Sequence, residues 1–102
     1  MKYQLVLQFP AASIEDYDAL ILLEDVILAR LGDLGEVDGH DAGVGEMNLF
    51  VHTDSPERAY QTIKAFPEFA RFGGDAKVAY RALDAGDFHV LHPAGLADFT
   101  VQ

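Results

Sequence analysis

The feature that most constrains the fold of this chain is the stretch of residues 35–54, GEVDGHDAGVGEMNLFVHTD. In its second half, apolar and polar side chains alternate, and this period of two residues is typical of a strand with one buried face. Gly43 and Gly45 can adopt the positive φ that a tight turn needs. The stretch therefore predicts a β-hairpin whose tip is residues 43–45 or 41–45.

The length of that tip decides which side chains share a face of the sheet. An odd tip places Val37 on the same side as the alternating apolar residues of the second strand, whereas an even tip places it opposite, because a shift of one residue reverses every side chain. We therefore favour an odd tip, which leaves one apolar face and one face rich in carboxylate, amide and imidazole groups. That polar face is expected to contain Glu36, Asp38, His40, Glu46, Asn48, Phe50 and His52.

Further strands and a helix are expected around this hairpin. Residues 2–9 and 76–83 alternate between apolar and polar side chains, as half-buried strands do. Residues 13–31 should form a helix, because Ser13 can cap its first amides and Gly32 can end it.

A second helix should begin at Pro56, since proline is favoured at the first helical position. The resulting order, β-α-β-β-α-β, is that of a ferredoxin-like sandwich, in which an antiparallel four-stranded sheet has both helices on one face. We expect a single domain over residues 1–102. Within it, residues 83–102 should form an irregular C-terminal extension with short strands at 88–91 and 98–101.

The first helix places a carboxyl group among apolar side chains. Glu24 projects into the middle of its predicted packed face, which comprises Ile14, Tyr17, Leu20, Ile21, Ile27, Leu28 and Leu31. Leu22, Leu23 and Val26 lie off this face and could pack elsewhere or stay on the surface. A buried carboxylate is costly without a partner. Glu24 is therefore a candidate buried acid for acid–base chemistry, or a carboxylate that reaches solvent or a hydrogen-bond donor at the edge of the packed face.

Composition excludes several classes of function. The formal net charge of −10 disfavours binding to nucleic acids and to anionic membranes, and it would suit a basic partner or serve solubility alone. The chain has no cysteine, so disulfides and thiolate chemistry are excluded. No apolar run resembles a signal peptide or a membrane span, so we expect a cytoplasmic protein.

With both helices on one face, the opposite face of the sheet should be open. Val6 and Phe50 would form a small apolar centre there, inside a polar rim, an arrangement typical of interfaces. We therefore expect a non-catalytic binding domain that forms a homodimer or binds a basic protein or a small ligand. The candidate binding residues are Gln4, Gln8, Asp38, His40, Glu46, Asn48, Phe50, His52 and Arg81.

Two other functions compete for the same face. The first is a metal site at His40 and His52, because imidazole nitrogens together with carboxylate oxygens suit zinc, iron or manganese. Carboxylates of Glu36, Asp38 or Glu46 would complete that site. The second is a small metal-free enzyme in which one of the two histidines acts as a general base and a neighbouring carboxylate orients it. No nucleophile is evident, and no cofactor is expected.

Overall fold

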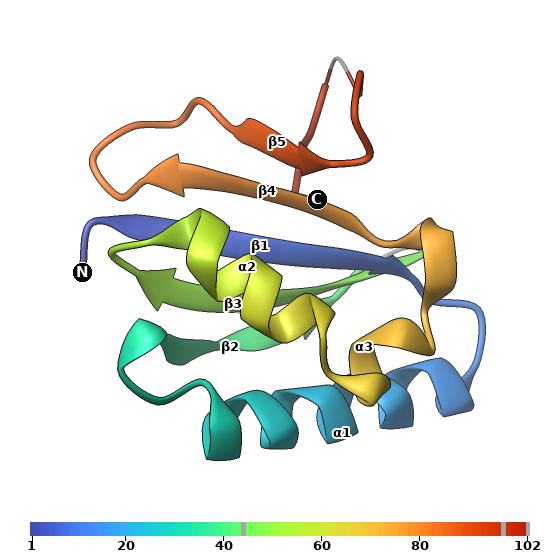
Figure 1. Ribbon diagram of the computed structural model, residues 1–102. Coiled ribbons are helices and arrows are strands. Elements are labelled where there is room, and N and C mark those ends of the chain that lie inside the picture. Colours follow the sequence, from blue (N-terminus) through green and yellow to red (C-terminus); the bar gives the residue numbers. More distant parts are fainter. Residues whose placement is uncertain (44, 97, 102) are drawn as a thin grey trace.

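The computed structural model describes residues 1–43, 45–96 and 98–101 as one sheet packed against helices (Figure 1). The elements within these ranges are β1 (Tyr3–Pro10), α1 (Ile14–Arg30), β2 (Glu36–Ala42), β3 (Glu46–Thr53), α2 (Pro56–Lys64), α3 (Pro67–Ala70), β4 (Lys77–Ala82) and β5 (His89–His92). Short 3-10 turns at Gly32–Leu34 and Gly73–Asp75 follow α1 and α3. The predicted α+β sandwich is confirmed.

The described strands form one antiparallel sheet in the order β2-β3-β1-β4-β5. This sheet has five strands where four were expected, because β5 of the C-terminal extension pairs with β4. The strand expected at residues 98–101 is absent, since these residues are described and form none. In the hairpin, β2 ends at Ala42 and β3 begins at Glu46, which agrees with the shorter predicted tip. The middle residue of the tip, Val44, lies outside the described residues.

The main core lies between the sheet and the helices. Leu5, Leu7 and Phe9 of β1 point into it and are at most 1% exposed. The Phe9 ring stacks on Phe72, with ring centroids 4.0 Å apart. Removal of these apolar surfaces from water is the main force that holds helices and sheet together. The same burial raises the pKa of the Tyr60 hydroxyl above its ordinary value.

Helix α1 begins and ends as predicted, but its packed face overlaps the predicted one only in part. The Ser13 hydroxyl accepts from the backbone amide of Asp16 at 3.3 Å, and Gly32 follows the helix with a φ of 64°. The buried residues of α1 are Ala19, Leu20, Leu23 and Ile27. In contrast, Ile14, Tyr17 and Leu28 of the predicted face are 78%, 41% and 62% exposed. The predicted packed face is therefore confirmed at Leu20, Ile27 and Leu31 and wrong at the three exposed positions.

The C-terminal extension covers part of the outer face, which is the sheet surface opposite the helices. Phe99 is 9% exposed and packs on Val6 and Ala79, which are both fully buried. Phe50 and Phe88 also pack against this cluster, and the rings of Phe88 and Phe99 are 4.9 Å apart between centroids. The apolar centre was expected to be open, but side chains of the C-terminal extension cover it.

We predict that Gly35→Ala destabilises the fold. Its backbone is extended, but an added Cβ would lie 2.8 Å from the His52 carbonyl oxygen and 3.0 Å from Val51 Cγ1. Overpacking against backbone should cost about 1–3 kcal/mol in the free energy of unfolding, measured by urea denaturation. Gly86→Ala is the matched control, because an added Cβ meets no atom within 4 Å there. Equal stability of the two variants would contradict the prediction.

Candidate functional site

A β-bulge in β2 changes which side chains share a face. Val37 and Gly39 pair with consecutive residues of β3, so Asp38 is an extra residue between them. As a result, His40 lies opposite Leu49, whose side chain belongs to the main core. The prediction that His40 shares the polar face was therefore wrong, because the extra residue turns it toward α1.

On that side of the sheet, His40 contacts Glu24, the acid that the sequence singles out on α1. His40 Nδ1 lies 2.9 Å from Glu24 Oε2, and His40 Nε2 lies 3.1 Å from the Tyr17 hydroxyl. Because a carboxylate only accepts, Nδ1 carries a proton and donates it, and in the neutral imidazole Nε2 accepts from the phenol. The side chains of His40 and Glu24 are 26% and 14% exposed. Glu24 thus reaches a hydrogen-bond donor at the edge of the packed face, one of the two situations expected for it.

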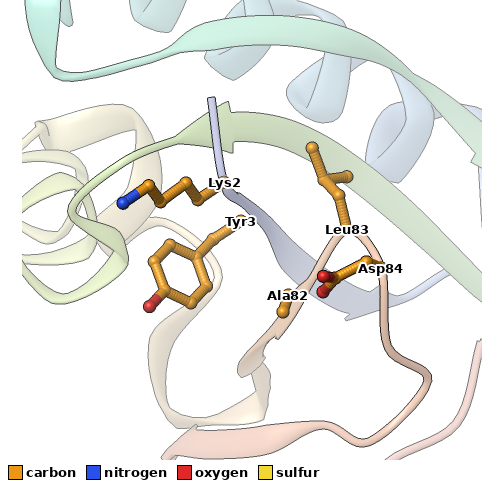
Figure 2. Close-up of a pocket in the computed structure, with 5 residues that line it drawn as sticks. All are labelled: Lys2, Tyr3, Ala82, Leu83 and Asp84. Atoms are coloured by element: carbon orange, nitrogen blue, oxygen red, sulfur yellow. The ribbon is translucent and has the colours of Figure 1, made fainter.

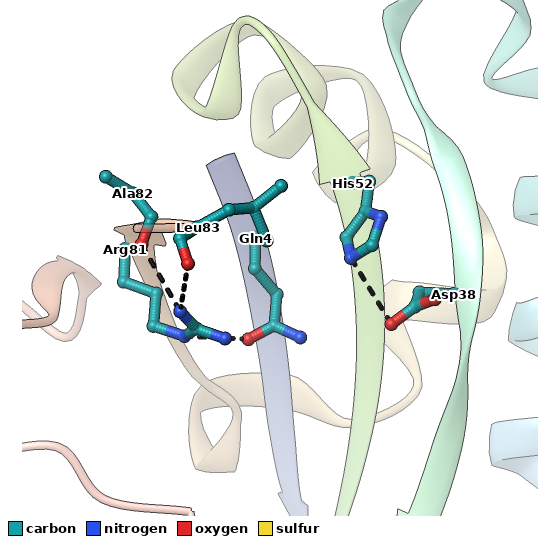
Figure 3. Close-up of polar contacts among 6 residues, drawn as sticks. All are labelled: Gln4, Asp38, His52, Arg81, Ala82 and Leu83. Atoms are coloured by element: carbon teal, nitrogen blue, oxygen red, sulfur yellow. Dashed lines mark hydrogen bonds and ion pairs between the residues drawn. The ribbon is translucent and has the colours of Figure 1, made fainter. Parts of the chain in front are cut away.

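The polar row, formed by Asp38, His52, Gln4 and Arg81, crosses the outer face (Figure 3). Asp38 Oδ2 lies 3.3 Å from His52 Nε2, and Arg81 Nε donates to Gln4 Oε1 at 3.1 Å. Gln4 is paired with His52 on one side and with Arg81 on the other, so the row runs across β2, β3, β1 and β4. Arg81 also donates to three backbone carbonyls, one at the end of β4 and two in the turn that follows it. Much of its hydrogen-bonding capacity is therefore used within the chain.

A buried polar network lies toward the other end of the outer face. Gln8 is 6% exposed and Asn48 is 0% exposed. Gln8 Nε2 lies 2.9 Å from the Thr100 carbonyl oxygen and 3.0 Å from both Asn48 Oδ1 and Glu46 Oε2. Asn48 Nδ2 in turn donates to Asp41 Oδ1 at 2.9 Å. The predicted binding residues Gln8, Glu46 and Asn48 are thus brought together. Their hydrogen bonds, however, join them to one another and to the C-terminal extension.

The two histidines of the predicted metal site do not converge. His40 faces α1, whereas His52 belongs to the polar row on the outer face. Among the residues described, no group of three or more His, Asp or Glu side chains is arranged to hold a metal ion. Each imidazole also contacts a different carboxylate: His40 contacts Glu24, and His52 contacts Asp38.

A pocket that sequence periodicity did not predict lies where β1 begins and β4 ends. Its volume is about 480 Å³, and Figure 2 shows its lining residues, Lys2, Tyr3, Ala82, Leu83 and Asp84. This volume is within the range of small-molecule sites. The turn after β4 forms one wall of this pocket. Apolar and polar residues do not alternate in a turn, so periodicity could not predict the pocket. None of the predicted binding residues lines it.

Comparison with protein-family models, curated proteins and solved structures returned no match. Within the described residues, no helix has both the length and the apolarity needed to cross a membrane. Function must therefore be inferred from the geometry of this chain alone.

Proposed function

We propose that this protein is a binding domain that recognises a basic protein segment along the β2 edge and the adjoining polar row, a role that needs no catalysis. The observation that carries this proposal is the exposure of three carboxylates on one strand, Glu36, Asp38 and Asp41. In the described sheet, β2 has a strand on one side only. An edge strand offers backbone donors and acceptors to a partner, and its side chains decide which partner fits.

The charge of this edge favours a basic partner over a second copy. Two β2 strands placed side by side would bring like charges together, which disfavours pairing. The net charge of −10 would further speed the encounter with a cationic protein. Phe99 covers Val6 and Ala79 on the outer face, and the polar row stays partly exposed beside β2, where the His52 and Asp38 side chains are 31% and 47% exposed.

We also infer that the sandwich is ferredoxin-like and extended by a fifth strand. The β2-β3-β1-β4 part of the sheet order and the packing of α1 and α2 on one face support this assignment. The predicted homodimer would use a different surface, the exposed apolar residues Ile14, Leu22 and Leu28 of α1, because large exposed apolar side chains favour association. Native mass spectrometry would measure whether that dimer forms.

The binding proposal is tested with an arginine- and lysine-rich peptide of about ten residues, followed by fluorescence anisotropy. We expect the double variant Glu36→Gln, Asp38→Asn to weaken binding about tenfold, since each lost surface charge pair is worth up to about 1 kcal/mol. Affinity of the unmodified protein should fall as salt is raised from about 0.05 M to 0.3 M, because exposed charges are screened.

The matched control is the double variant Asp84→Asn, Asp87→Asn, which alters the net charge equally at exposed positions in the turn before β5. It should retain most of the affinity for the peptide. Equal weakening by the two double variants would show that the peptide responds to net charge alone and would contradict a site on β2. Affinity that does not depend on salt would also contradict the proposal.

A further inference from the structure

The geometry points to a second activity on the other side of β2: Tyr17 is a nucleophile toward neutral acyl esters, with His40 as its general base and Glu24 as a positioning residue. This inference is independent of the proposed binding role, because these three side chains lie on the helix side of the sheet. The sequence singles out His40 and Glu24 separately, and the bulge at Asp38 is what joins them.

The three side chains form the arrangement that activates nucleophiles in many enzymes. A nucleophile must lie within hydrogen-bond reach of a base, and a third group must orient that base. The Tyr17 hydroxyl lies 3.1 Å from His40 Nε2, and His40 Nδ1 lies 2.9 Å from Glu24 Oε2. Glu24 thereby holds the imidazole in the tautomer whose Nε2 can accept the phenolic proton.

Accessibility favours Tyr17 as the reacting group. Tyr17 is 41% exposed, whereas Tyr60 is 5% exposed and Tyr3 and Tyr80 are half-buried. An incoming ester can therefore approach the Tyr17 hydroxyl while the imidazole and carboxylate remain more protected behind it.

The surroundings of Tyr17 indicate the class of substrate. Ile14 and Ile21 are three and four residues away on α1, so they flank Tyr17 on the same helix surface. Ile14 is 78% exposed, and Ile21 is half-buried. The net charge of −10 repels phosphate esters and other anionic donors. A neutral ester with an apolar acyl chain fits both conditions.

The reaction would proceed in two steps. In the first, the Tyr17 oxygen bonds to the ester carbonyl carbon as the phenolic proton passes to His40 Nε2. The bond from that carbon to the leaving oxygen then breaks, and the imidazole gives the proton to that oxygen, or to water when a stable phenolate leaves, so that His40 is neutral again. In the second, water attacks the acyl group on Tyr17 and gives a proton to the imidazole. The Tyr17 oxygen leaves and regains a proton, so that the carboxylic acid is released and the side chain is restored.

The test uses p-nitrophenyl butyrate as the probe and the full chain as the enzyme. We expect a burst of p-nitrophenolate that approaches one equivalent per chain, with the butyryl group located on Tyr17 by peptide mass mapping. Tyr17→Phe should abolish this labelling. His40→Gln should slow the burst at least about tenfold, because general bases typically contribute about 10²–10⁴-fold.

Two further variants separate catalysis from structure. His89→Gln changes an exposed histidine of β5 and should leave the burst rate unchanged. Glu24→Gln keeps an acceptor for the His40 proton but loses the charge, and it should lower the burst rate about threefold to tenfold without changing the ester concentration that gives half the maximal rate.

Circular dichroism and thermal melting establish which variants are folded. If His40→Gln does not fold, two other results test the proposal. They are the position of the butyryl group in the wild type and the loss of labelling in Tyr17→Phe, which changes an exposed residue. A butyryl group found elsewhere in the wild type would overturn the proposal. An unchanged burst rate in folded His40→Gln would overturn it as well.

Discussion

Leu23→Ala should lower the free energy of unfolding by about 3 kcal/mol, within the range of about 2–5 kcal/mol measured for buried leucines in other proteins. Leu23 is 0% exposed and belongs to the main core beneath α1. Removing its side chain forfeits apolar burial and leaves a cavity that the sheet can fill only in part. Urea denaturation measures the loss, and an unchanged m-value would show that the unfolding transition is otherwise the same.

Leu28→Ala is the matched control for that experiment. The helical projection of the sequence assigns Leu28 to the packed face and leaves Leu23 off it, but the structure places Leu28 at the surface with 62% exposure. Its truncation should change stability by no more than about 0.5 kcal/mol. A larger loss from Leu28→Ala than from Leu23→Ala would mean that α1 packs as the projection predicts.

These two leucines show why the orientation of α1 could not be derived from its sequence. The helix carries large apolar side chains on several sides, so that Leu22, Leu23 and Leu28 all compete for the packed face. Helix ends were easier to predict, because Ser13 and Gly32 act locally on their own backbone. The packed face is instead chosen by the shape of the sheet, which a helical projection does not contain.

The position of His40 was unpredictable for a different reason. Strand alternation assumes one residue of β2 for each residue of β3, and the bulge breaks that rule at Asp38. Gly39, with a φ of 129°, was a possible signal, since glycine inside a strand often marks a bulge. If β2 had no bulge, alternation would place His40 on the polar face. Glu24 would then need a different hydrogen-bond partner.

The shared face of Asp38, His52, Gln4 and Arg81 was easier to anticipate. These residues were assigned to one face by alternation, which is undisturbed along β1, β3 and β4 and holds along β2 as far as Asp38. The C-terminal extension was not predictable in the same way. Its residues 93–101 have no regular period, so nothing in the pattern indicates that Phe99 packs against β1 and β4.

Phe99→Ala should destabilise the chain by about 3 kcal/mol, near the lower end of the range for buried phenylalanines in other proteins. Phe99 is the buried aromatic anchor that holds the extension on Val6 and Ala79. Thr100→Ala is the matched control, because Thr100 is exposed and Gln8 binds its backbone carbonyl, which the substitution preserves. Urea denaturation should show a change of no more than about 0.5 kcal/mol for this control.

The outcome for Phe99 also bears on where a partner can bind. If the extension holds as tightly as its burial implies, a partner reaches the outer face only at the polar row and the acidic β2 edge. If Phe99→Ala costs no more than Thr100→Ala, the extension is not anchored in solution, and Val6 and Phe50 become available as the apolar centre of a larger interface. In that case the binding variants on β2 would no longer define the whole site, and Phe50→Ala would have to be tested beside them.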